Sequence, residues 1–322
     1  MSIKINYLKK LVNNQTSNLV LFTNDKFQIK SLNRFLSNSE FSYIQDLLKT
    51  GDLKKKLFIF ELNSKKKIVL ISIKNDLKNS DIENLGATFY KRVNHGKNNE
   101  YNIISDSIDS KYKNFLGFFL HGLKLKSYEF KKYKTKKETR LISINILGNK
   151  NKPHLKEQLK FKAIEEGTFY ARDLVSEPGN VLHPDEYSKR INSLKKYGLK
   201  INIYNEKKLK KLGMNTLLGV GQGSVRGSYL VTIEWNGLKD KSKPVAFVGK
   251  GVCFDTGGIS LKPAKFMEDM TYDMAGSAVV VGLMKSLALR KAKINAVGVV
   301  GLVENMPGGN AQRPGDIVKS YS

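Results

Sequence analysis

Cysteine is almost absent from this chain of 322 residues, which contains only Cys253. A single thiol excludes an internal disulfide and fits a reducing compartment. A catalytic thiol would need a histidine partner nearby. The histidines are few and scattered, with no pair at the spacing of metal ligands on one helix face: His95, His121, His154 and His183. We therefore interpret Cys253 as a small packed residue.

Long apolar runs are also missing. Residues 1–6 carry no apolar signal-peptide core, and no apolar run reaches the length of a transmembrane helix. We therefore expect no membrane partner and a cytoplasmic location. Hydrophobic residues still make up 40% of the chain, which is long enough for two domains with substantial cores.

Acidic residues are scarce: 29 Asp and Glu stand against 56 Lys and Arg, for a formal net charge of +27. Such a balance raises the alternative of a basic DNA-binding or regulatory protein. The excess is spread, however, with 29 basic and 13 acidic residues in 1–150 and 27 and 16 in 151–322. Lysine greatly outnumbers arginine, which indicates a compositional bias and solubility more than a binding stripe. The lysine-rich run at 131–137 is expected to be a solvated loop.

Residues 1–150 alternate strand-like and helix-like segments, which predicts an α/β domain. The expected strands are residues 17–23, 57–62, 67–73 and 140–147, and the expected helices are residues 81–92 and 114–124. Residues 148–153 (GNKNKP) are rich in turn formers, so we place a domain boundary there, at residue 150.

Residues 151–322 alternate in the same way and predict a second α/β domain, with a central mixed, largely parallel sheet covered by helices. The expected helices are residues 155–174, 206–212 and 273–289 and one beginning at Pro184; the expected strands are residues 199–204, 229–234, 245–248 and 294–303. If the last two strands are parallel, the segments that follow them lie at the same edge of the sheet.

The segment from residue 244 to 278 gathers the most chemistry. The apolar run 245–248 predicts a short buried strand, and Lys250 follows it, at the edge where α/β sheets bind ligands. Asp255, Lys262 and Asp273 come next, and the glycines at 257 and 258 allow backbone to approach a bound group. The segment therefore brings two lysines and two aspartates to a strand end and a helix start.

Two carboxylates beside a glycine-lined pocket suit divalent cations that prefer oxygen ligands. A lysine can join them only as a neutral amine, which requires burial and a nearby cation. Lys250, at the end of a buried strand, fits that role, whereas Lys262 can stay charged and stabilise an oxyanion. Two alternatives stay open on spacing alone: a phosphate-binding loop, although its motif order is absent, and ordinary ion pairs on a solvated face.

Several stretches resemble the leucine aminopeptidases, or cytosol aminopeptidases. They are residues 171–180 (ARDLVSEPGN), 212–215 (LGMN), 219–224 (GVGQGS), 248–263 (VGKGVCFDTGGISLKP), 270–278 (MTYDMAGSA) and 304–316 (ENMPGGNAQRPGD). The resemblance is specific, covers nearly all of residues 155–322 and is loose over residues 1–150.

The resemblance implies a two-metal exopeptidase that removes N-terminal residues, often leucine, from peptides with a free N-terminus. By motif position Lys250 would be a neutral-amine metal ligand and Asp255 would bridge both metals. Asp273 would bind the same metal as Lys250 and help to hold the peptide's amino group. Lys262 would be the catalytic lysine at the oxyanion, and Met270 would line the side-chain pocket, although a plain core methionine is an equal interpretation.

The family pattern also includes a later segment, Asn-Thr-Asp-Ala-Glu-Gly-Arg, that supplies two more carboxylates and an arginine thought to hold a bicarbonate base. The sequence stops at Ser322, before that segment. We therefore expect a fragment without peptidase activity, and hydrolysis of a leucine anilide by this chain would contradict that expectation. The resemblance further implies two divalent ions per subunit, zinc or manganese with magnesium as a further alternative, and a homo-oligomer, typically a hexamer.

Overall fold

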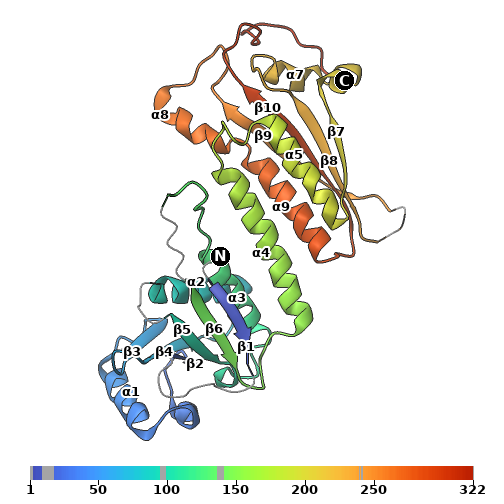
Figure 1. The fold of residues 1–322 in the computed structure, drawn as a ribbon. Helices are drawn as coiled ribbons and strands as arrows, with labels where there is room; N and C mark the ends of the chain where they lie inside the picture. The colour runs from blue at the N-terminus through green and yellow to red at the C-terminus, as the bar shows by residue number, and fades with distance from the viewer. Residues whose placement is uncertain are drawn as a thin grey trace. The chain divides into compact units, whose positions relative to one another are not determined.

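The computed structural model describes residues 3–8, 18–94, 99–135, 141–238, 240 and 242–321. The chain divides into two compact units, Met1–Phe161 and Lys162–Ser322. The division falls within helix α4 (Leu155–Ser176). Among the described residues each unit contains one sheet, and Figure 1 labels the strands of both sheets.

The first unit is built on a six-stranded sheet with the order β1-β6-β5-β2-β4-β3. All neighbouring strands run parallel except β3 and β4, which are antiparallel. The strands are β1 (Ile3–Tyr7), β2 (Asn18–Asn24), β3 (Leu57–Glu61), β4 (Lys67–Ile73), β5 (Glu100–Ile104) and β6 (Ile142–Leu147). The helices are η1 (Lys30–Phe35), α1 (Asn38–Thr50), α2 (Asn79–Val93), η2 (Ser105–Ser107) and α3 (Phe115–Lys126).

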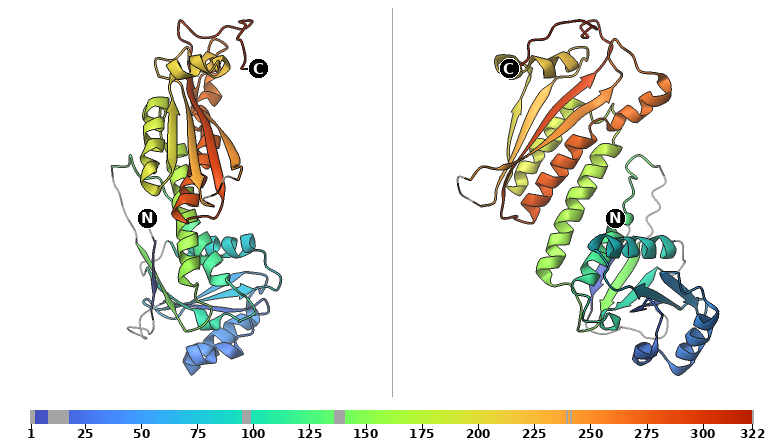
Figure 2. Two further views of the ribbon diagram at one scale, coloured as in Figure 1. Left: turned by 90° about the vertical axis from the view of Figure 1, so that its right-hand side faces the viewer. Right: turned by 180° about the vertical axis from the view of Figure 1, so that it is seen from behind.

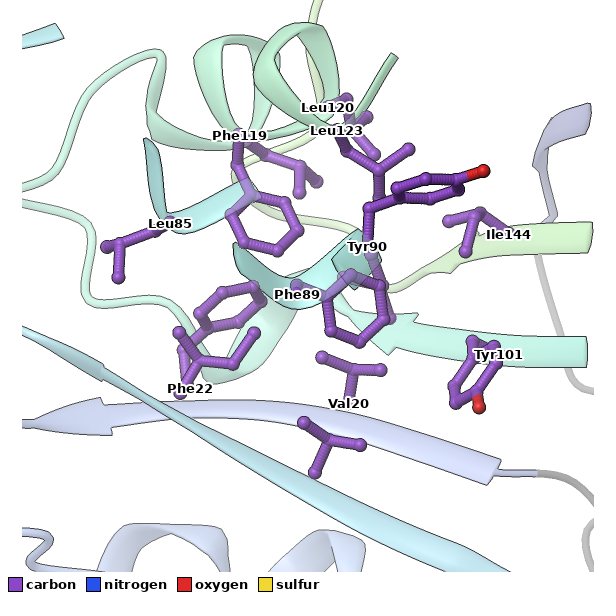
Figure 3. Packing of buried hydrophobic residues seen from close by; sticks show 14 of the residues in the cluster. Val20, Phe22, Leu85, Phe89, Tyr90, Tyr101, Phe119, Leu120, Leu123 and Ile144 are labelled. Carbon is purple, nitrogen blue, oxygen red and sulfur yellow. The ribbon is translucent and has the colours of Figure 1, made fainter. Parts of the chain in front are cut away.

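Aromatic residues fill the core between this sheet and helices α2 and α3. Phe22 on β2 meets Phe119 on α3 edge to face, with 5.4 Å between ring centroids, and Phe89 on α2 packs against both Phe119 and Tyr101. Figure 3 shows these rings interleaved with Val20 and the leucines of the two helices. Burial of such large side chains is the main stabilising contribution to this unit.

Every strand and helix expected in residues 1–150 is present in the first unit. The sequence pattern did not predict β1, β5 and α1, because their apolar positions are few or interrupted by polar residues. Residues 131–135 form turns and irregular backbone, as expected for a loop, and residues 136 and 137 lie outside the described residues.

The second unit holds a four-stranded sheet with the order β7-β8-β10-β9. The strands are β7 (Lys200–Tyr204), β8 (Tyr229–Asn236), β9 (Val245–Asp255) and β10 (Asn295–Asn305). The helices are α5 (Pro184–Asn192), η3 (Ser193–Tyr197), α6 (Glu206–Lys211), α7 (Asn215–Gly221), α8 (Ala264–Met267), η4 (Glu268–Tyr272) and α9 (Ala275–Leu289). The tyrosine hydroxyl of Tyr187 on α5 lies 3.1 Å from Ser277 Oγ on α9, and both helices contribute to one core with the sheet (Figure 2).

The mixed α/β class is confirmed for the chain. In the second unit β9 and β10 are parallel, which meets the condition for the segments after them to lie at the same edge of the sheet, whereas β10–β8 and β8–β7 are antiparallel. Parallel pairing among the described strands of this sheet is therefore confined to the two strands whose carboxyl ends carry the candidate site.

Two expectations about the strand at residue 245 were wrong. It is not short, because β9 continues to Asp255, and it is not buried, because β9 forms an edge of the sheet and Val248 is 79% exposed. Lys250 consequently lies in the middle of an edge strand rather than at the end of a core strand. The flanking glycines mark close backbone packing: a Cβ on Gly249 would lie 2.6 Å from the backbone of Ser277.

One helical segment, Ala264–Leu289, is long and apolar enough to cross a membrane by length and composition alone. It consists of α8, η4 and α9, and α9 supplies Ala278, Val281 and Met284 to the core of the second unit. A buried core helix of this kind passes the same test, so the segment is weak support for a membrane span.

Candidate metal centre

Lys250 and Asp273 form the first ion pair of the candidate site. Asp273 directly follows η4, two residues before α9 begins, and its Oδ1 lies 2.8 Å from Lys250 Nζ. The lysine side chain is 60% exposed, while the aspartate is 19% exposed. The second oxygen of Asp273, Oδ2, is buried and has no hydrogen-bond partner among the described residues. A buried carboxylate oxygen without a partner is costly, and a bound cation would satisfy it.

Asp255, the last residue of β9, is the centre of a second cluster. Its Oδ2 accepts a hydrogen bond from Lys262 Nζ at 2.8 Å, and its Oδ1 accepts from Asn305 Nδ2 at 2.7 Å and from the Gly257 amide at 2.9 Å. Partial burial pushes the pKa of Asp255 upward, but the hydrogen bonds from Lys262, Gly257 and Asn305 outweigh it and hold that pKa below its usual value. The carboxylate is therefore kept ionised.

The loop after β9 delivers Lys262 back to this carboxylate. The Lys262 amide donates to the Thr256 carbonyl at 2.9 Å, which closes the loop, and Gly257 takes the positive φ of 91° that the turn requires. Lys262 Nζ also lies 2.9 Å from the sulfur of Met270 on η4. Three residues singled out in the sequence, Asp255, Lys262 and Met270, are thus in one contact group.

A shift in strand register decides which way Asp255 faces. Val252 pairs with Val303, but Asp255 pairs with Asn305, so β9 contains one more residue than β10 over this interval. Because side chains alternate along a strand, residues 250 and 255 would lie on opposite faces of a regular strand. The extra residue, a β-bulge, returns Asp255 to the face of Lys250.

The donor set fits a divalent cation in part. Asp255 and Asp273 offer carboxylate oxygens, and Lys250 offers a nitrogen once it has lost its proton. Across the part of the chain that the structure describes, no group of three or more His, Cys, Asp or Glu side chains could hold a metal ion. The described residues therefore provide two carboxylates and an amine, and not a complete site of carboxylates and imidazoles.

Asn305 belongs to this cluster, although the sequence analysis predicted no role for it. It stands in the stretch 304–316, two residues after the expected strand 294–303, which is the available signal. Because β9 and β10 are parallel, the ends of both strands meet at one edge, which places residue 305 at the same edge as Asp255, while their direct pairing depends on the register shift.

Comparison with known proteins begins with the fold. The solved structure of a bottromycin maturation enzyme, BotP, in complex with Mn superposes with a TM-score of 0.75 and 23% sequence identity, covering 95% of this chain and 63% of that one. A likeness at this identity establishes an α/β fold shared with that enzyme.

The sequence comparisons then give the family. Residues 169–322 match the model of the cytosol aminopeptidase family, catalytic domain. A probable cytosol aminopeptidase from Chelativorans sp. (strain BNC1) is 55% identical over 206 residues, and one from Brucella anthropi is 54% identical over 212 residues. These matches cover 62% of this chain and 42% of each relative. Residues 169–322 are therefore similar to the catalytic domain of the cytosol aminopeptidase family, and the match spans less than half the length of the relatives.

Proposed function

We propose that residues 151–322 carry part of the active site of a metallo-aminopeptidase that removes N-terminal residues, of the leucine type, from peptides. The observation that carries the proposal is the pair of carboxylates, Asp255 and Asp273, each contacting a lysine, with one buried oxygen of Asp273 that has no hydrogen-bond partner among the residues that the structure describes. The family match of residues 169–322 supports the same reaction class. The DNA-binding alternative rests on net charge alone, and the family match does not favour it.

Each residue has a distinct proposed task. Asp255, Asp273 and the neutral amine of Lys250 would hold divalent metal, which supplies polarisation of the scissile carbonyl and activation of water. Asp273 would also bind the peptide's amino group. Lys262 would keep its proton and stabilise the negative charge that develops on the carbonyl oxygen, since its ammonium already lies beside Asp255. Met270 would line the pocket for the first side chain of the peptide.

The number of donors sets what this chain can do alone. Two metal ions with about four ligands each need more donors than two carboxylates and one amine provide. We therefore propose that the 322-residue chain binds metal but does not turn over peptides at a measurable rate. Metal identity (zinc, manganese or magnesium), a cytoplasmic location and a homo-oligomer such as a hexamer remain proposals that rest on the family resemblance.

The test is to measure metal binding by the purified chain, using calorimetric titration with Mn²⁺ and with Zn²⁺. The native chain should bind, and Asp273→Asn should bind at least tenfold more weakly because the buried oxygen loses its charge. Asp269→Asn, an exposed aspartate on η4, is the matched control and should leave binding unchanged. Equal affinity of the native chain and Asp273→Asn would refute the assignment. Hydrolysis of a leucine anilide in parallel tests the expected lack of turnover.

A further inference from the structure

We propose that Asn305 is a positioning residue for Asp255: its side-chain amide fixes the rotation of the carboxylate and thereby sets which oxygen faces a bound cation. The inference rests on the proposed function, because it assigns Asn305 a role toward a proposed metal ligand. Nothing in the resemblance gave this residue a task.

The contacts divide the two oxygens of Asp255 cleanly. Oδ1 receives two donors from the protein, the Asn305 amide at 2.7 Å and the Gly257 backbone amide at 2.9 Å. Oδ2 is contacted by Lys262 Nζ at 2.8 Å. The terminal torsion of an aspartate is broad, so the carboxylate plane is free to turn unless hydrogen bonds hold it. Two donors on one oxygen remove that freedom, because rotation would break both.

Hydrogen bonds to its backbone carbonyl fix Asn305 in turn. The Asn305 carbonyl accepts from the Thr256 amide and from Thr256 Oγ1, both at 2.9 Å. The register shift in β9 makes Asn305 the direct neighbour of Asp255; in a continued regular register Phe254 would stand there. The asparagine is therefore fixed at its backbone and free to use its side chain on the carboxylate.

The chemistry of the amide explains why an asparagine suits this position. Its NH₂ group donates to a carboxylate without adding charge, so the carboxylate stays anionic and available to a cation. Hydrogen bonds that orient a metal-binding side chain typically change metal affinity by about 10- to 100-fold when they are removed. With Oδ1 engaged inside the protein, Oδ2 is the oxygen presented to the metal, in competition with Lys262.

The experiment measures Mn²⁺ affinity of the full 322-residue chain by electron paramagnetic resonance of free Mn²⁺. Asn305→Leu, which keeps bulk but removes the donor, should bind Mn²⁺ about 10- to 100-fold more weakly than the native chain. Asn305→Ala serves as the second variant if the leucine does not fold. Thermal unfolding of each metal-free variant shows whether the protein is folded at the temperature of the titration.

The matched control is Thr256→Val, which removes the hydroxyl bond to the Asn305 carbonyl and leaves the amide–carboxylate contact intact. The variant should lower the melting temperature, because the loop loses a hydrogen bond. Its Mn²⁺ affinity should stay within threefold of that of the native chain. Loss of affinity in both Thr256→Val and the Asn305 variants would mean a merely structural role and would overturn the inference. Native affinity in folded Asn305→Leu or Asn305→Ala would also overturn it while the proposed function stands. Failure of the native chain to bind Mn²⁺ would remove the proposed function and this inference together.

Discussion

The Lys262 ammonium lies 2.8 Å from Asp255 Oδ2, so the lysine proposed to stabilise the reaction's negative charge forms an ion pair with the carboxylate proposed to hold metal. The pair is partly shielded, with the lysine 32% and the aspartate 16% exposed. A cation that approaches Asp255 must therefore share or replace this contact. Lys262 and metal are competitors for one oxygen.

Replacement of Lys262 should strengthen metal binding. Partly exposed ion pairs contribute up to about 1 kcal/mol, so Lys262→Met should lower the Mn²⁺ dissociation constant by roughly two- to fivefold. Lys265→Met removes the same charge from an exposed position on α8 and controls for long-range attraction. Equal or weaker Mn²⁺ binding in Lys262→Met than in Lys265→Met would contradict the competition.

Metal binding should release a proton from Lys250, because its ammonium has no lone pair and the amine must be neutral to act as a ligand. Affinity should then rise with pH, approaching tenfold per pH unit for one released proton. Calorimetric titration in buffers of different ionisation enthalpy counts the protons. Lys250→Arg, which stays charged, should release about one proton fewer; an unchanged count would exclude Lys250 as a ligand.

Asp185 should stabilise the folded second unit at neutral pH, and this stabilisation should be lost in acid. Its Oδ1 accepts from the Tyr229 hydroxyl at 2.7 Å and the Gly227 amide at 3.2 Å, and Oδ2 lies 3.1 Å from His183 Nδ1. Burial raises the pKa of Asp185, but these partners outweigh burial and lower it. The stabilisation is therefore present above the unfolded value of about 3.9 and disappears as pH falls through the lower folded value.

Urea unfolding followed by the fluorescence of Trp235, the single tryptophan, reports on this unit. Asp185→Asn should lower the free energy of unfolding by about 1 to 3 kcal/mol at pH 7 and by a smaller amount at pH 3. Glu268→Gln, at an exposed position, is the control for loss of a negative charge. A pH-independent difference would show that the ionised form of Asp185 is not the stabilising one.

Helices α4 and α9 cross at a glycine pair that should not tolerate a methyl group. A Cβ on Gly282 would lie 2.5 Å from the Gly167 carbonyl oxygen and 2.9 Å from the Ala171 Cβ. Alanine normally favours a helix over glycine by about 1 kcal/mol, but overpacking costs about 1 to 3 kcal/mol. We expect the clash to exceed the gain, so that Gly282→Ala lowers the unfolding free energy. Val279→Ala, where the side chain is 63% exposed on the same helix, should change it by less than about 0.5 kcal/mol.

The sequence predicted the elements of the fold better than the local geometry of the site. Alternating apolar patches were enough to predict β4, α9 and β10, because burial of one face dictates the pattern. The glycines beside Lys250 were misread as the end of a strand, although Gly249 marks close contact with α9 and Gly251 close contact with β10, both of which depend on distant segments. The pairing of Asp255 with Asn305 was equally out of reach, since a register shift is a property of two strands together.

That shift has a consequence for how this part of the protein tolerates change in length. Deleting one residue between positions 252 and 255 would restore a regular pleat without disturbing the strands on either side, so folding would survive. The acidic group would keep Asn305 as its partner on β10 and would stay on the same face of the strand as Lys250. The loss of a single codon there is therefore compatible with the pairing of Asp255 and Asn305.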